Sequence, residues 1–123
     1  MKTLVISFGL LISSITSSAQ SHTLSATQYN LHRPGSQTAS GSKINANKLK
    51  SGKIRWVALS RDMLKIYPFD SIIRVESKEH PELNGSWVVK DKMGPRHKKC
   101  IDFLIYKGQS RLGKTKVKIE KIG

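Results

Sequence analysis

Two aspartates, Asp91 and Asp102, are the first candidates for chemistry in this sequence. Asp91 ends one apolar, strand-like run, and Asp102 lies inside the next such run. The loop between them contains Gly94, Pro95 and a dense set of cations. An acid placed where a strand meets a loop, with a second acid on the following strand, can build a two-carboxylate site. Paired carboxylates of this kind perform general acid–base catalysis.

The same two aspartates also have a purely structural interpretation. A general acid that works near neutral pH needs a raised pKa, from burial or from a neighbouring carboxylate such as Asp102. The nearby cations act in the opposite direction, but strand alternation places Lys90 and Lys92 on the face opposite Asp91. In the structural alternative, Asp91 only caps a turn and Asp102 pairs with a lysine. The sequence leaves both interpretations open.

Six short segments have the composition and alternation of β-strands, and these elements must position the carboxylates. The last segment alternates strictly, with Val117 and Ile119 on one face and charged residues on the other. Helix is scarce, so we expect only a short turn at 60–65, capped by Ser60, and another at 109–112. The predicted fold is an all-β, six-stranded barrel, whose closure removes sheet edges. The predicted strands are 24–29, 54–59, 71–76, 87–90, 101–106 and 115–122.

The beginning of the chain has the pattern of a secretory signal peptide at residues 1–19. Lys2 supplies the positive charge, residues 4–15 are mostly apolar, and small residues precede a cleavage point after Ala19. The apolar run is shorter than the roughly 20 residues of a membrane-spanning helix. We therefore expect one domain at 20–123, exported to the periplasm or the extracellular space, with no transmembrane segment after cleavage.

Composition narrows the possible partners of this domain. The formal net charge is +14, and loss of Lys2 with the signal leaves +13, which favours a polyanionic partner. Export makes nucleic acid the weaker choice, so we expect an acidic wall polymer and no nucleic acid. Cys100 is the single cysteine, which excludes an internal disulfide, and the histidines lack metal-ligand spacing. We expect a monomer without a metal site, and strand-centred Trp56 and Trp87 in apolar packing.

Several fragments, in order along nearly the whole mature chain, together resemble a known superfamily. Their order is similar to that of the double-psi β-barrel proteins of the bacterial cell wall, nearest to the three-aspartate domain proteins and the rare lipoprotein A group. The membrane-bound lytic transglycosylase A family and the expansins share this barrel. The fragments are 26–30 (ATQYN), 38–41 (TASG), 56–61 (WVALSR), 67–75 (YPFDSIIRV), and 85–91 (GSWVVKD) leading to 101–104 (IDFL).

The resemblance implies a peptidoglycan-active domain that cleaves glycan strands as a lytic transglycosylase and uses no cofactor. The aspartate matching Asp91 would protonate the glycosidic oxygen and then take the proton of the sugar's 6-hydroxyl, forming a 1,6-anhydro product. Asp102 would lie beside it in the catalytic site. Thr38, in the Thr-Ala-Ser-Gly fragment, would line the groove.

The chain departs from this family pattern at two places. Ser60 stands where the rare lipoprotein A group has a His and the three-aspartate proteins an Asp, and Asp62 is the candidate to substitute for it. The turn after Asp91 is one residue longer than the family's Asp-x-Gly. The Ser60 departure favours the alternative, a non-catalytic, expansin-like module whose basic face binds the wall, whereas the retained Asp91 and Asp102 favour the enzyme.

Four further residues are candidates for binding peptidoglycan or another anionic wall polymer. Tyr29, at the end of the first strand, can contact a glycan. Arg61 either orients a carboxylate or belongs to the helical turn. Lys92 and Arg96, with the basic run 96–99, can bind lactyl or stem-peptide carboxylates, although such runs are often only solvated loops.

Overall fold

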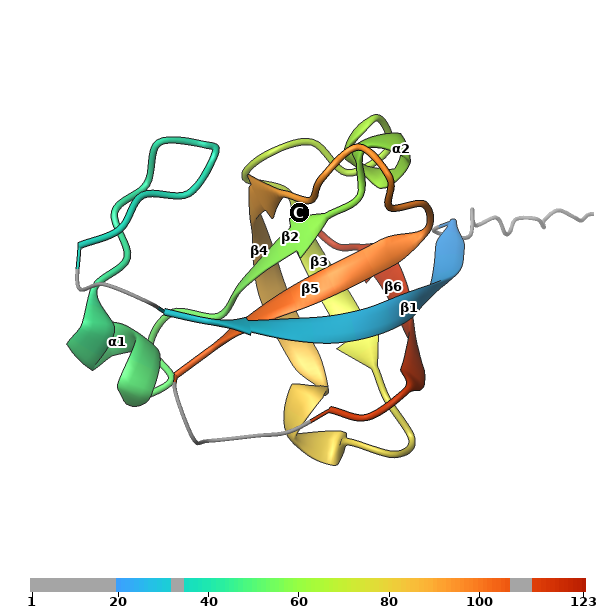
Figure 1. Cartoon of the computed structure of the whole chain (residues 1–123). Coiled ribbons are helices and arrows are strands. Elements are labelled where there is room, and N and C mark those ends of the chain that lie inside the picture. Colours follow the sequence, from blue (N-terminus) through green and yellow to red (C-terminus); the bar gives the residue numbers. More distant parts are fainter. Residues whose placement is uncertain (1–19, 32–34, 107–111) are drawn as a thin grey trace, which may run out of the picture.

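A computed structural model describes residues 20–31, 35–106 and 112–123, and β-strands dominate it (Figure 1). The predicted all-β architecture with six strands is confirmed, and the strand ends differ from the predicted ones by at most three residues. The strands are β1 (Ser21–Asn30), β2 (Trp56–Leu59), β3 (Ile72–Glu76), β4 (Gly85–Lys92), β5 (Cys100–Ile105) and β6 (Thr115–Lys121). The short helices are α1 (Ala46–Lys50), α2 (Arg61–Leu64) and the 3-10 turn η3 (Pro81–Leu83).

The strands close into one barrel in the order β1-β5-β2-β4-β3-β6, with β6 returning to β1. The β1–β5 and β2–β4 pairs are parallel and the other pairs are antiparallel. Closure pairs each strand on both sides and leaves no open sheet edge. Because β2 lies between β4 and β5, the strands that carry Asp91 and Asp102 follow each other along the chain but are not neighbours in the barrel.

The barrel interior is filled by alternate residues of the six strands. In β6, Val117 and Ile119 are buried and the intervening lysines are exposed, as the alternation predicts. Trp87 packs edge to face against Phe103, with 4.8 Å between ring centroids. Its indole N–H donates to the carbonyl of Leu83 at 2.7 Å, so the polar edge of this buried ring has a partner. Trp87 is therefore a core residue, as predicted.

A second apolar cluster lies outside the barrel, between α1, the hairpin at 35–44 and the outer face of β5. Figure 1 shows α1 and the hairpin on one side of the barrel. Trp56 is half-buried and packs against this cluster rather than inside the barrel. The cluster fixes the hairpin beside the outward-facing residues of β2 and β5. Its buried members are Ile44, Leu49 and Leu104, and Tyr29, Leu31, Ile54 and Tyr106 pack around them.

The helical turns differ in part from those predicted. Ser60 precedes α2, but its side chain makes no cap hydrogen bond, because its Oγ accepts the N–H of Cys100 at 3.0 Å instead. Helix α1 was not expected; Asn45 caps it by accepting the N–H of Lys48 at 2.9 Å. The turn predicted at 109–112 falls largely outside the described residues, as does the predicted signal peptide. In the described part of the chain, no helix has the length and apolarity needed to span a membrane.

Candidate functional site

The two aspartates lie in one row across the outside of the barrel. In the strand register, Thr27 of β1 pairs with Asp102 of β5, which pairs in turn with Ala58 of β2. Ala58 then pairs with Asp91 of β4 because the register shifts between Val57 and Ala58. Directly paired residues project from the same face of a sheet. The β-bulge therefore brings Asp91 into the row that already contains Asp102.

This row opens into a solvent-accessible cavity of about 250 Å³. That volume equals roughly eight water molecules, enough for a small polar group of a ligand. Lys92 lines the same cavity as Asp91, although alternation placed it on the opposite face. The lining residues are Tyr29, Ala58, Asp91, Lys92, Met93, Gly94, His97 and Asp102.

Asp91 uses its two carboxylate oxygens differently. Oδ1 accepts the backbone N–H groups of Ala39 at 2.8 Å and of Lys92 at 2.9 Å. Oδ2 accepts the hydroxyl of Tyr29 at 3.4 Å. One oxygen thus holds a turn in place, as the structural alternative predicted. The second oxygen faces the phenol that lines the cavity.

Thr38 shapes the turn that Asp91 holds, and it is not among the residues lining the cavity. Its side chain is buried, and its Oγ1 lies 2.8 Å from the Oγ of Ser40 and donates to the carbonyl of Ser42 at 3.4 Å. The N–H of Ser40 donates to the carbonyl of Lys90 at 3.2 Å, which docks the turn on β4. Thr38 therefore presents the neighbouring backbone to Asp91 and has no direct access to a ligand.

Two groups of the cavity, Asp102 and Tyr29, have raised pKa values. Burial raises the pKa of Asp102, and the charge of Asp91 adds to this effect. The hydroxyl of Thr27, which donates to Asp102 at 2.7 Å, and the charge of His97 partly offset it. Burial also raises the pKa of Tyr29, reinforced by both aspartates, so this phenol is a neutral hydrogen-bond donor. Asp102 consequently keeps its proton to a higher pH than an ordinary aspartate does.

Besides Thr38, four predicted site residues lie outside the cavity lining. Ser60 is fully buried and bound to the backbone of Cys100. Asp62 accepts the N–H of Lys99 at 3.0 Å; burial works against its charge, but the hydroxyl of Ser60 and backbone N–H groups hold its pKa below the usual range. Asp62 is therefore engaged with the backbone at the start of α2 and β5 and is not among the residues that line the cavity. Arg61 and Arg96 are exposed and take no part in the cavity wall.

Sequence reasoning missed Thr27, Ala58 and Ala39. The alternation of β1 could have placed Thr27 on the face of Tyr29, two residues further on. Ala58 carries no such signal, because a small residue in an apolar strand is compatible with either face. The contact of Ala39 with Asp91 depends on how a distant hairpin docks.

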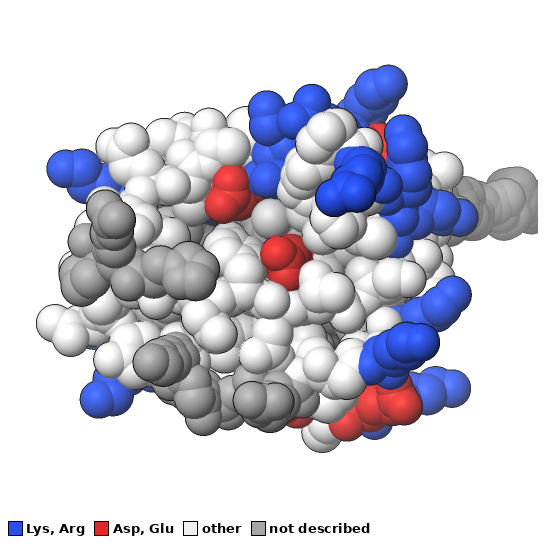
Figure 2. Space-filling model, in the orientation of Figure 1, with Lys and Arg blue, Asp and Glu red and all other residues white. Residues whose placement is uncertain are grey.

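Charge is unevenly distributed around this region. On the face of the molecule drawn in Figure 2, the acidic side chains near the middle stand apart from each other, and Lys and Arg gather at the upper right and along the right-hand edge. Within the described ranges, no group of three or more His, Cys, Asp or Glu residues is arranged to hold a metal ion.

Fold and site together define a small, double-psi-like β-barrel with a carboxylate-lined cavity on its outer face. No protein-family model matches the sequence, and no curated protein does. Among solved structures, the apo form of an expansin from Clavibacter michiganensis matches 85% of this chain with a TM-score of 0.58 and 12% identity. An aspartate-to-asparagine mutant of that expansin, in complex with cellohexaose, matches 85% with a TM-score of 0.57 and 12% identity.

These comparisons establish the fold at the level of the barrel. The chain spans 51% of each expansin chain, so it corresponds to about half of those proteins. This likeness supports a related barrel fold for the chain. The narrower assignment to the three-aspartate or rare lipoprotein A proteins stays a prediction.

Proposed function

We propose that this chain is a cell-wall polysaccharide-binding domain whose binding site is the cavity between Asp91 and Asp102. One observation carries the proposal: two carboxylates and the neutral phenol of Tyr29 meet in an open cavity of about 250 Å³. Carboxylate oxygens accept hydrogen bonds from sugar hydroxyls, and a phenol can both donate and accept. The match of the barrel to an expansin solved with cellohexaose supports the same class of ligand.

The surroundings of the cavity support binding over cleavage. Ser60, at the position of the family's His or Asp, is buried and bound to Cys100. One oxygen of Asp91 already accepts two backbone N–H groups, so this carboxylate also serves as a structural anchor. A proton-transferring group needs a free path to the glycosidic oxygen. The arrangement is better suited to holding a glycan in place.

Lytic transglycosylase activity is the second candidate, and the raised pKa of Asp102 favours it. Burial raises the pKa of Asp102, and a carboxyl that retains its proton is what a general acid requires. If the domain is this enzyme, Asp102 rather than Asp91 protonates the glycosidic oxygen. Transfer of the sugar's 6-hydroxyl proton back to Asp102 then closes the 1,6-anhydro ring.

Export belongs to the same proposal. The pattern at 1–19 is that of a secretory signal, and a single barrel domain at 20–123 would then act in the periplasm or outside the cell. The net charge of +14 favours peptidoglycan or another anionic wall polymer as the ligand. We propose that the domain acts as a monomer and does not bind nucleic acid.

The test is co-sedimentation of the protein beginning at Gln20 with purified sacculi and with cellulose, followed by mass spectrometry of released fragments. Asp91→Asn and Asp102→Asn are compared with Asp70→Asn, which makes the same chemical change at an exposed carboxylate outside the cavity. A binding domain should lose affinity with the first two variants, keep it with the third and release no sugar. Anhydro-ended fragments that disappear with Asp102→Asn would establish the enzyme instead. Unchanged binding in all three variants would overturn the cavity as the site.

A further inference from the structure

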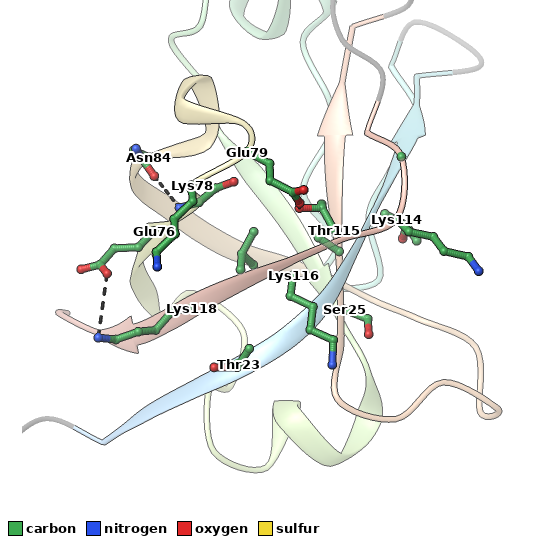
Figure 3. A pocket seen from close by; sticks show the side chains of 15 residues that line it. Thr23, Ser25, Glu76, Lys78, Glu79, Asn84, Lys114, Thr115, Lys116 and Lys118 are labelled. Carbon is green, nitrogen blue, oxygen red and sulfur yellow. Dashed lines mark hydrogen bonds and ion pairs between the residues drawn. The ribbon is translucent and has the colours of Figure 1, made fainter.

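A second and larger cavity, of about 1280 Å³, lies on the outside of β1 and β6 (Figure 3). Thr27 connects it to the carboxylate cavity, because Thr27 lines the larger cavity while its hydroxyl donates to Asp102 at 2.7 Å. The two cavities are therefore neighbours on one continuous outer surface. We call the larger one the lysine groove, after Lys78, Lys114, Lys116 and Lys118 in its lining.

The positive charge of the lysine groove is only partly balanced. Glu76 and Glu79 are the two acidic residues in its lining. Glu76 lies 3.8 Å from the ammonium of Lys118, and Glu79 accepts the hydroxyl of Thr115. Within the ranges that the structure describes, no ion pair involves Lys78, Lys114 or Lys116. Figure 3 shows Lys78 entering from the loop after β3, and the other lysines from β6 and the residue before it.

The floor of the groove adds hydroxyl groups to these charges. Ser25 pairs with Lys116, and Thr23 pairs with Lys118, in the β1–β6 register. Paired residues share a face, so hydroxyls and ammonium groups stand side by side on the outside of the barrel. A lysine ammonium is a compact, adaptable charge that binds carboxylates, and serine and threonine hydroxyls bind sugar hydroxyls. The groove thus presents the chemistry that an acidic sugar needs.

We propose that the lysine groove is a second subsite, which binds carboxylate-bearing sugar units of the polysaccharide held in the carboxylate cavity. This inference rests on the proposed function for the class of ligand. The charge of Asp91 disfavours a further carboxylate in the carboxylate cavity, because like charges at close range repel. Uncharged sugar units then occupy the first cavity, and acidic units lie across Thr27 in the groove. The domain would select a partly acidic wall polysaccharide over a neutral one.

Two soluble probes test the subsites separately by calorimetric titration of the protein beginning at Gln20. Hexagalacturonate, with a carboxylate on every unit, reports on the lysine groove, and neutral cellohexaose reports on the carboxylate cavity. The groove variant combines Lys78→Gln, Lys114→Gln and Lys116→Gln. The matched control removes the same charge from exposed positions on the hairpin and around α1, as Lys43→Gln, Lys48→Gln and Lys53→Gln.

At about 0.1 M salt, we expect the groove variant to bind hexagalacturonate about tenfold more weakly and the control variant less than twofold more weakly, because exposed charges act mainly within a Debye length. Cellohexaose affinity should be unchanged in both. Equal loss of hexagalacturonate affinity in both variants would overturn the groove, since net charge alone would explain it. Wild-type protein that fails to bind hexagalacturonate would also overturn it. Groove-dependent binding of hexagalacturonate without any binding of cellohexaose would support the groove and refute the carboxylate cavity as a glycan site.

Discussion

Substitution of Asp91 can separate its anchoring role from its role in the cavity. Asp91→Ala removes the acceptor for the N–H groups of Ala39 and Lys92, which lie 2.8 and 2.9 Å from Oδ1. A hydrogen bond to a charged group contributes about 1.5–3 kcal/mol, but both N–H groups are exposed, so water replaces part of what is lost. We expect the free energy of unfolding to fall by about 2 kcal/mol. Asp91→Asn keeps an oxygen acceptor and should cost less than about 0.5 kcal/mol.

Urea unfolding monitored by tryptophan fluorescence measures both changes. Glu76→Ala is the matched control, because it removes an exposed carboxylate that lies 3.8 Å from the ammonium of Lys118. That control should cost less than about 0.5 kcal/mol. Asp91→Ala as stable as the wild type would refute the anchoring role. Asp91→Asn as unstable as Asp91→Ala would show that the charge, rather than the acceptor oxygen, holds the turn.

Three other predictions concern the pKa of Asp102, the contacts of Arg55 and the salt dependence of binding. Because burial raises the pKa of Asp102 in the folded protein, the free energy of unfolding should fall as the pH rises from the ordinary aspartate pKa, about 3.9, through the raised value. Asp102→Asn should flatten that part of the curve, measured by urea unfolding between pH 4 and 7, and an unchanged slope would contradict this account. Arg55→Met should lower the free energy of unfolding by about 1–2 kcal/mol, as measured by thermal unfolding. The reason is that the guanidinium lies 4.2 Å from the Trp87 ring centroid and donates to the backbone carbonyls of Glu82 and Asn84. Raising NaCl from about 0.1 to 0.5 M should weaken co-sedimentation with anionic wall polymer several-fold, and salt-independent binding would argue against a charged ligand.

The strands were predictable because their signals are local. In β6, alternation of apolar and charged residues over seven positions identifies both the strand and its buried face. Trp87 was correctly expected in apolar packing, whereas Trp56 packs on an outer cluster that forms only when α1 and the hairpin dock. Helix α1 escaped prediction because five residues give too short a pattern for a period of 3.6 to be recognised.

The candidate site was predictable only in part. Asp91 and Asp102 stood out as carboxylates in apolar surroundings, and Tyr29 as a polar aromatic at a strand end. The structure brings these three into one cavity with Lys92. Ser60 turned out to satisfy a backbone N–H within the fold, which its sequence position did not reveal.

The sequence by itself determined the number of strands, the buried face of β6, the strong positive charge and the two acids. Only the tertiary structure decided that β2 lies between the strands of those acids, and that a register shift at Ala58 aligns Asp91 with Asp102. Only the tertiary structure, likewise, places Thr27 between the carboxylate cavity and the lysine groove. The physical reason is that alternation depends on residues next to each other along the chain. Barrel closure, strand order and register depend on contacts between segments far apart, which no local pattern specifies.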